Sequence, residues 1–333
     1  MVAGGVVAFS DPQAYQAAIS PAQVELFVTA KGKYRAALTQ LELHRLWLQR
    51  GRENLPRVAN AAVRTDRLAL FFLASADQAS TRHSGRDLAF GEIVASAAGS
   101  TQHLRTEGPC HWATLSMTRH DLAAACHALI GRDPIERSVT RYMRPRLLEM
   151  SRLLHLHQVA GQFVKRERHL LAQSEPARAL KQALVHAMVM CLNENTPVKM
   201  GAGVRRHAAI IARFEELLAA NYDRPLHIAE ICAAIGASER ILRISCIEHL
   251  GMGPIRYLWL RRMHLARRGL IVADAATSTV TKIATENGFF ELGRFAVEYR
   301  ALFGEAPSVS LRRPSEEIRP SKNPFDFADS EYV

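Results

Sequence analysis

Two short segments near the C-terminus repeat one pattern of apolar, small and turn-forming residues. They are ICAAIG at 231–236 and IATENG at 283–288, so the offset between them is 52 residues. Each has a small second residue, as a close crossing of two helices requires, and a final glycine, which suits a tight turn. A stretch with helical spacing follows each glycine. The repeat therefore predicts two helix-turn-helix units in one helical block.

The second copy continues into the stretch ENGFFELGRFAVEYRALFGEAP at 286–307. Large apolar residues recur there at steps of three, four and three, which places them on one side of a helix: Leu292, Phe295, Tyr299 and Leu302. The opposite side carries small residues with arginines beside them: Gly293, Val297 and Ala301, flanked by Arg294 and Arg300. Because small side chains keep a helix surface low, this side is expected to approach an anionic partner closely.

The first copy has a similar frame. Ser238 is the expected N-cap of a helix whose outward side carries Arg240 and Ile244, with Arg243 at its flank. Between the copies, residues 254–270 predict a helix that starts with a proline and is about 25 Å long. A helix of that length suits two recognition helices held about one DNA turn, roughly 34 Å, apart.

Composition and charge limit the possible classes of protein. The chain has 333 residues, which suggests about two domains, and a net charge of +11, which permits an acidic partner. Residues 204–313 contain sixteen Lys and Arg against eleven Asp and Glu, a difference of +5. The five cysteines are scattered and odd in number, so we expect a reducing, cytoplasmic location without disulfides. We expect neither a signal peptide nor a membrane span, because no long uncharged apolar segment occurs.

The N-terminal half differs from the C-terminal block in its pattern of apolar residues. Short apolar runs and alternating patterns between about 22 and 118 predict strands, and helical spacings follow from 119. We therefore predict an α+β chain with these parts: a β-rich effector or regulatory domain at 1–118, a helical dimerisation and linker region at 119–202, a DNA-binding domain at 203–313 and a flexible tail at 314–333. The polar and Gly-rich segment 193–203 is the expected linker.

The C-terminal block resembles the DNA-binding domain of the AraC/XylS family of bacterial transcription regulators. The motifs that carry the resemblance span about 204–313: RPLHIAEICAAIGAS, GPIRYLWLRRMHLARRGL, TVTKIATENGF and GRFAVEYRALFGEAPS. The form GF-x-x-LGRF-x-x-x-Y-x-x-x-FGE-x-P resembles ethanolamine-operon-type activators. The resemblance implies two helix-turn-helix units, joined by a long helix, that bind consecutive major-groove segments of double-stranded DNA. It also implies a separate N-terminal domain, often a cupin-like β-barrel, for a small-molecule effector or for dimerisation.

The match to the family pattern is uneven between the two units. In the first unit Ser238, Arg240 and Leu242 match, but Ile244 stands where the family usually has arginine and Cys246 where it usually has phenylalanine. The second unit matches at these positions: Ile283, Ala284, Gly288, Phe289, Phe295, Phe303, Gly304 and Pro307. The second unit therefore matches the family pattern at more positions than the first.

The expected DNA-contacting residues come from both recognition helices: Ser238, Arg240, Arg243, Ile244, Gly293, Arg294 and Arg300. We expect Arg294 to contact a base edge and the later Arg300 to contact a phosphate. The alternative for each arginine is an ordinary solvated helix face. Two roles stay open for Ile244: contact with a thymine methyl group, or packing against another protein surface.

These observations predict a transcription regulator rather than an enzyme, and family habit favours an activator. Its expected partners are DNA, RNA polymerase, an unknown small-molecule effector and a second copy of the chain in a homodimer. No cofactor or metal is expected, because the strand-rich part has no H-x-H pair and the chain has no P-loop, G-x-S-x-G or G-x-G-x-x-G motif. Two alternatives stay open: a cupin-like metalloenzyme with a basic helical domain, and an adaptor whose duplicated helices bind protein.

Overall fold

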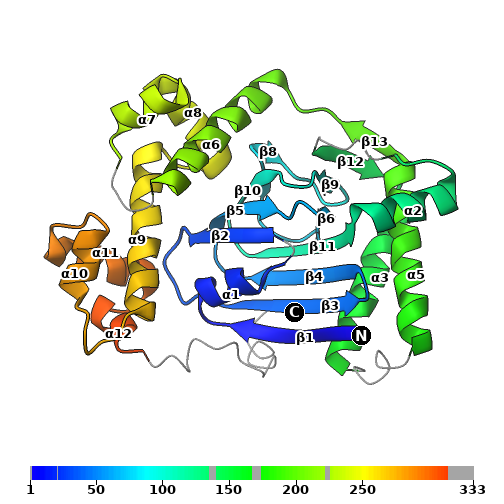
Figure 1. The fold of residues 1–333 in the computed structure, drawn as a ribbon, viewed down its shortest axis with the longest axis horizontal. Helices are drawn as coiled ribbons and strands as arrows, with labels where there is room; N and C mark the ends of the chain where they lie inside the picture. Colours follow the sequence, from blue (N-terminus) through cyan, green and yellow to red (C-terminus); the bar gives the residue numbers. More distant parts are fainter. Residues whose placement is uncertain (1, 21, 135–139, 167–173, 222–225, 314–333) are drawn as a thin grey trace.

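The chain folds into a β-rich part covered by helices on one side and a purely helical part on the other (Figure 1). The computed structural model describes residues 2–20, 22–134, 140–166, 174–221 and 226–313. The predicted α+β class, with strands before about 118 and a helical C-terminal block, is confirmed. The expected tail at 314–333 lies outside the described residues.

The strands form two sheets with antiparallel pairing. The larger sheet has eight strands in the order β1 (Val2–Phe9), β3 (Ala36–Leu43), β4 (Leu46–Glu53), β11 (Cys110–Thr118), β6 (Arg67–Leu73), β9 (Ile93–Ser96), β12 (Arg141–Pro145) and β13 (Asn195–Val198). The smaller sheet has five strands in the order β2 (Ala22–Val28), β5 (Arg57–Val63), β10 (Thr101–Thr106), β7 (Thr81–His83) and β8 (Arg86–Asp87).

Strand β6 shows why the middle of the larger sheet is apolar on both faces. Its side chains alternate, so that Leu70 and Phe72 enter a core shared with helices, while Phe71 and Leu73 enter a core between the two sheets. A strand buried on both faces has a continuous apolar sequence rather than an alternating one. This explains the run LALFFLA at 68–74.

The two sheets face each other as a sandwich, so the expected cupin-like barrel is not closed. Within the described strands β1 and β13 end the larger sheet, β2 and β8 end the smaller one, and no pairing joins the two sheets. Large side chains from both sheets fill the space between them, among them Leu26 of β2 and Trp112 of β11.

Helices cover the outer face of the larger sheet. These are α2 (Arg119–Ile130), α3 (Leu147–Arg166) and α5 (Ser174–Asn193), while α1 (Pro12–Ala18) lies beside β2. The segment 119–202 was expected to be helical, but β12 and β13 belong to it and extend the sheet beyond β9. Strand β13 also lies within the expected linker 193–203. Short polar edge strands such as NTPV lack the long periodic pattern that identifies a strand in sequence.

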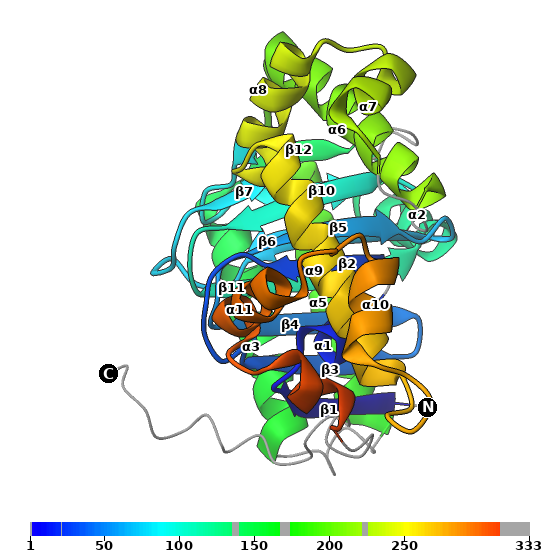
Figure 2. The ribbon, with the colours of Figure 1, turned by 90° about the vertical axis from the view of Figure 1, so that its left-hand side faces the viewer.

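The C-terminal helices form two groups at the ends of one long helix (Figure 2). They are α6 (Ala202–Ala220), α7 (Ile228–Ile235), α8 (Glu239–Leu250), α9 (Pro254–Val272), α10 (Val280–Glu286), α11 (Leu292–Phe303) and α12 (Pro307–Leu311). Helix α9 also packs against β2, and Phe27 and Val58 of the smaller sheet join the helical core. The β-rich part therefore shares a core with the helices that hold both units.

Candidate nucleic-acid interface

The first helix-turn-helix unit consists of α7, a turn at Gly236 and α8. Gly236 adopts the left-handed conformation, with φ of +63°, which a glycine tolerates without steric cost. Ser238 caps α8, because its hydroxyl accepts a hydrogen bond from the backbone N–H of Ile241 at 3.4 Å. Ile231 of α7 and Leu242 of α8 are fully buried in the shared core. The turn and cap predicted for this unit are confirmed.

The second unit consists of α10, a turn at Gly288 and α11. Thr279 caps α10 by accepting a hydrogen bond from the N–H of Lys282 at 3.2 Å. Aromatic rings hold α11 in place: the Phe289 and Phe295 centroids lie 4.9 Å apart, and those of Phe295 and Tyr299 lie 5.5 Å apart. Helix α11 is therefore fixed through an aromatic stripe.

Two details of α11 differ from the sequence-based expectation. Leu292 was placed on the buried stripe, but 37% of its surface is exposed because it is the first residue of the helix. Phe290, two residues before the helix, was not predicted as a surface residue, yet it is 75% exposed, and Val297 on the outward side of the helix is 70% exposed. Exposed apolar residues on a recognition helix suit contact with thymine methyl groups.

Helix α9 connects the two units. Pro254 is its first residue, as predicted, and its 19 residues give a length of about 28 Å. Tyr257, Met263 and Leu270 are fully buried along it, so each end of α9 is packed into one of the units. A rigid connection of this length fixes the spacing between α8 and α11.

The candidate contact residues of the first unit lie at the start and middle of α8. Arg240 and Arg243 are exposed, and Ile244 is 40% exposed. The hydroxyl of Ser238 already accepts the capping hydrogen bond. The structure therefore brings Arg240, Arg243 and Ile244 together on the accessible side of one helix.

The candidate contact residues of the second unit lie on the outward side of α11. Gly293 faces open space, since a Cβ added there would meet nothing within 4 Å, and Arg300 is exposed. The Arg294 side chain is 70% exposed and pairs with Glu298 at 2.9 Å, one turn further along the helix. These three residues form an exposed, low and basic surface.

Glu298 holds Arg294 in position. Partial burial opposes ionisation, but hydrogen bonds from Arg294 and from the indole Nε1 of Trp259, at 2.8 Å, lower the pKa of Glu298 below its ordinary value. The same hydrogen bond raises the pKa of Arg294. Arg294 is thus an exposed cation that is paired with a carboxylate of its own helix.

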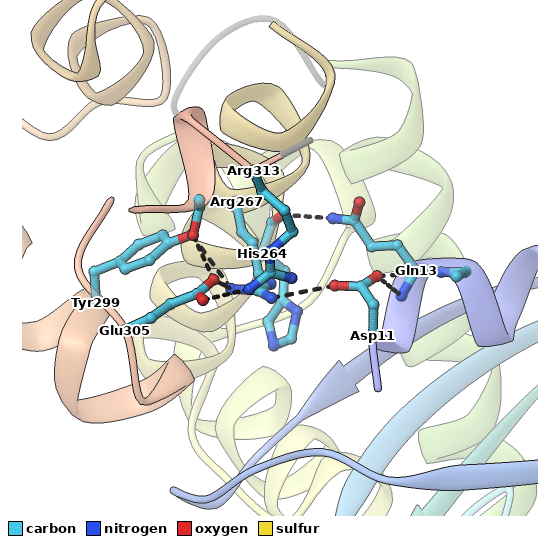
Figure 3. Close-up of polar contacts among 9 residues, drawn as sticks. Asp11, Gln13, His264, Arg267, Tyr299, Glu305 and Arg313 are labelled. Atoms are coloured by element: carbon cyan, nitrogen blue, oxygen red, sulfur yellow. Dashed lines mark hydrogen bonds and ion pairs between the residues drawn. The ribbon is translucent and has the colours of Figure 1, made fainter. Parts of the chain in front are cut away.

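A buried network of charged groups joins α9 to both the β-rich part and α11 (Figure 3). Arg267 of α9 donates to Asp11 at 3.1 Å and to Glu305 at 2.7 Å, and it lies 3.4 Å from the hydroxyl of Tyr299. Arg313 also pairs with Glu305. Burial opposes the charge of Arg267, but Tyr299, Asp11 and Glu305 raise its pKa overall. Sequence reasoning missed this network because Asp11 and Arg267 are distant in the chain.

His264 belongs to the same contact between α9 and the β-rich part. Its Nε2 lies 3.2 Å from the carbonyl oxygen of Val28, and its own carbonyl accepts a hydrogen bond from Gln13 at 3.4 Å. Burial lowers the pKa of His264 to about 4, so the ring is neutral at pH 7.

A second buried ion pair lies near the first unit. Arg261 of α9 pairs with Glu215 of α6 at 3.1 Å and with Glu25 of β2 at 3.3 Å. Burial raises the pKa of Glu215 to about 7, although Arg261 opposes that shift. Arg261 and Arg267 lie six residues apart within α9, so the two clusters tie the connecting helix to the β-rich part at two points.

No metal-binding cluster occurs among the described residues, where no group of three His, Cys, Asp or Glu could hold an ion. His83 and His103 of the β-rich part are buried, and His83 forms hydrogen bonds to Tyr142 and Gln102 at 2.8 and 2.6 Å. The five cysteines are free thiols. Within the described part of the chain, no helix is long and apolar enough to cross a membrane.

Comparison with known proteins places the similarity in the C-terminal block. Residues 231–313 match the family model described as a helix-turn-helix domain. The probable thc operon regulatory protein of Rhodococcus erythropolis is 41% identical over 97 residues, which cover 29% of each chain. The XylDLEGF operon transcriptional activator 1 of Pseudomonas putida is 34% identical over 101 residues, 30% of each chain. The matched part is therefore less than a third of these relatives.

Solved structures give related matches. A probable AraC family transcriptional regulator from Rhodopseudomonas palustris is 34% identical over 32% of this chain and 98% of its own, with a TM-score of 0.29. The AraC-like transcriptional activator CuxR is 16% identical over 85% of this chain and 100% of its own, with a TM-score of 0.41. The sequence match to the curated regulators and the two units joined by α9 agree: the C-terminal region of this chain is a helix-turn-helix domain of the AraC/XylS family.

Proposed function

We propose that this chain is a sequence-specific DNA-binding transcription regulator whose two units bind adjacent major-groove segments. The observation that carries the proposal is the pair of units held by α9, whose length of about 28 Å is close to the roughly 34 Å of one DNA turn. A regulator of this kind needs two recognition helices at a fixed spacing, and both α8 and α11 are anchored to that helix through a common core.

The outward side of α11 is the strongest candidate for base contacts. Gly293 leaves room for the backbone to approach the groove floor, and Arg294 suits a guanine edge through its two parallel N–H groups. Arg300 lies two turns later, where it suits a phosphate. On binding, Arg294 would exchange its pairing with Glu298 for the base.

In the first unit we assign Arg240 and Arg243 to DNA and give Ser238 the role of positioning the helix through its cap. The N-terminus of α8 also offers backbone N–H groups to a phosphate. Ile244 would meet a thymine methyl group if α8 enters the groove.

The remaining parts of the proposal concern the N-terminal region. We assign effector sensing to the β-sandwich around 1–118 and dimerisation to the helices of 119–202, where Leu147 and Leu148 of α3 are exposed. The proposal also includes a homodimer, a small-molecule effector and recruitment of RNA polymerase. It further includes activation rather than repression and a cytoplasmic location. Sedimentation of the purified chain tests the dimer, because a monomer at micromolar concentration contradicts it.

Genome-wide mapping of bound DNA, followed by titration of a recovered duplex in salt and competitor DNA, tests the proposal. Specific binding is expected to persist over competitor and to weaken steeply with salt, as phosphate contacts require. Equal affinity for all sequences would instead favour the protein-binding adaptor, for which the exposed Ile244 and Ile247 are the supporting observation.

A further inference from the structure

The β-rich part touches the first recognition helix directly. Strand β10 lies against α8, and the hairpin β7–β8 contacts the C-terminal part of the same helix through Arg82 and Gly85. Arg82 of β7 donates a hydrogen bond to the carbonyl oxygen of Glu248 at 3.1 Å and pairs with Asp87 of β8 at 2.7 Å. Arg82 therefore links the hairpin to the end of α8.

This contact is closely packed. Gly85 in the hairpin turn has φ of +79°, and a Cβ there would overlap the imidazole of His249, so only glycine allows this approach. On the other side, Arg105 of β10 lies against Gly251 in the same manner. His249 is buried, and neither of its ring nitrogens has a hydrogen-bond partner within the described residues. Shape rather than polar pairing holds this part of the contact.

The same part of the β-rich region also faces the side of α8 that carries candidate DNA-contacting residues. Ile244 and Ile247 form one wall of a cleft of about 570 Å³. The opposite wall belongs to the β-rich part and consists of Ser80, Arg82, Asp87, Arg105 and Glu107. The cleft is open to solvent but has protein on both sides, whereas a helix in a major groove about 12 Å wide has a sugar-phosphate backbone on each side of it. The two arrangements of α8 exclude each other.

The second recognition helix is not covered in this way. Val297 and Phe290 are 70% and 75% exposed, and Gly293 faces open space. Helix α11 is anchored from its buried side, through Tyr299 and the charged network around Arg267. In the arrangement described, the outward side of the second unit is open. In the first unit Ile244 and Ile247 face the β-rich part across the cleft, whereas Arg240 and Arg243 point away from it into solvent.

We propose that the hairpin β7–β8 and strand β10 form a latch on the first recognition helix, so that the closed chain binds DNA through its second unit and release of the latch adds the first. The latch is defined by the contacts of Arg82, Gly85 and Arg105 with residues 244–251. This inference rests on the proposed function, since it concerns which unit contacts DNA.

The test compares the full-length parent with the double variant Arg82→Ala/Arg105→Ala. Both arginines are at the domain contact, so their loss weakens the latch while the sheet hydrogen bonds of the backbone remain. The matched control is Arg45→Ala/Arg64→Ala, which removes two arginines of the same β-rich part whose ion pairs are with Asp121 and Asp66. The probe is a duplex selected from a randomised pool with the double variant.

The double variant is expected to bind this duplex about tenfold more tightly than the parent, because a closed fraction lowers apparent affinity in proportion. Adding Arg240→Ala should weaken the double variant at least about fivefold and the parent much less, since Arg240 contacts DNA only after release. In the DNA-free chain, amide hydrogen exchange over 244–251 should rise in the double variant and not in the control.

Each alternative result has a distinct meaning. Specific binding with equal affinity in parent and double variant, and an equal effect of Arg240→Ala, overturns the latch and leaves the proposed function standing. Absence of specific binding in both chains overturns the proposed function and the latch with it. A rise in hydrogen exchange in the control variant as well would assign the change to general loosening, which also overturns the latch.

Discussion

The two helix-turn-helix units share a frame but differ in what anchors and covers them. Helix α11 is held by Phe295 and Tyr299, whose rings pack on each other, and its outward side is exposed. Helix α8 is held by Leu242 and the small Cys246, and its outward side faces the β-rich part across a cleft. A repeated local motif therefore does not imply equal access to a ligand, because neighbouring domains determine which surfaces are open.

The largest expected effect is on the free energy of unfolding, through the side chains that anchor α8 and α11. Phe295→Ala should lower the free energy of unfolding by about 3–5 kcal/mol, since it removes a buried ring and leaves a cavity. Cys246→Ala, at the place in α8 that corresponds to Tyr299 of α11, should cost about 1 kcal/mol because a buried thiol is a small apolar group. Urea unfolding followed by circular dichroism measures both. Equal costs would show that the two units are anchored alike.

The next effect concerns base contacts of the exposed unit. Arg294→Ala should weaken binding to the specific site by about 1–3 kcal/mol and binding to other sequences much less. Arg300→Ala is the matched variant: it should weaken all sequences similarly and reduce the salt slope by about 1, as loss of one phosphate contact does. Fluorescence anisotropy over a salt series separates the two. A folded Arg294→Ala chain that binds its site as tightly as the parent would remove α11 from the proposed interface.

A pH effect should distinguish the covered helix from the exposed one. Burial lowers the pKa of His249 to about 4, against about 6.5 in the unfolded chain; Glu248 opposes this shift, and His207 and Arg82 add to it. The neutral ring therefore contributes stability that is fully present above pH 6.5 and is lost as pH falls towards 4.

Helix α11 contains no histidine, although His264 of α9, whose pKa is also lowered to about 4, packs against Phe303 at its end, so the loss that is due to His249 should appear in α8. Hydrogen-exchange protection, corrected for intrinsic rates, should fall over 244–251 between pH 7 and pH 5 and change less over 295–303. The variant His249→Gln should flatten the pH dependence of α8. Equal loss in both helices would contradict a role for His249.

The smallest effect concerns two glycines in helices. Gly293→Ala should raise the free energy of unfolding by about 0.5–1 kcal/mol, because the site is open and alanine favours helix. It should nevertheless weaken DNA binding if the backbone approaches a groove floor there. Gly269→Ala in α9 is the contrasting variant, since its Cβ would lie 3.0 Å from Ile283 and should not stabilise. Tighter DNA binding by Gly293→Ala would argue against close approach at this position.

The features predicted correctly from the sequence are those governed by neighbours along the chain. Ser238 and Pro254 occupy the helix starts expected of them, and Gly236 forms the expected turn. Their effects depend on hydrogen bonds and dihedral angles within a few residues, so a single sequence contains the necessary information. The predicted contacts of Arg240, Arg243, Gly293, Arg294 and Arg300 with DNA remain predictions.

The features that were missed depend on residues far apart in the chain. Strands β12 and β13 pair with each other and with β9, and their short, polar sequences predicted no strand. The barrel was expected to close, but the pairing gives two sheets with free edges among the described strands. Strand pairing is set by register and by the shared core, which a local pattern does not specify.

Local sequence patterns were enough to predict two similar units in succession, with helix starts, turns and a connecting helix of nearly one DNA turn. The contact between Arg267 and Asp11, and the β-rich part that faces Ile244, follow from the packing of distant segments. The physical reason is that turns and caps are fixed by short-range interactions, whereas the surface that covers Ile244 is built from strands more than a hundred residues away.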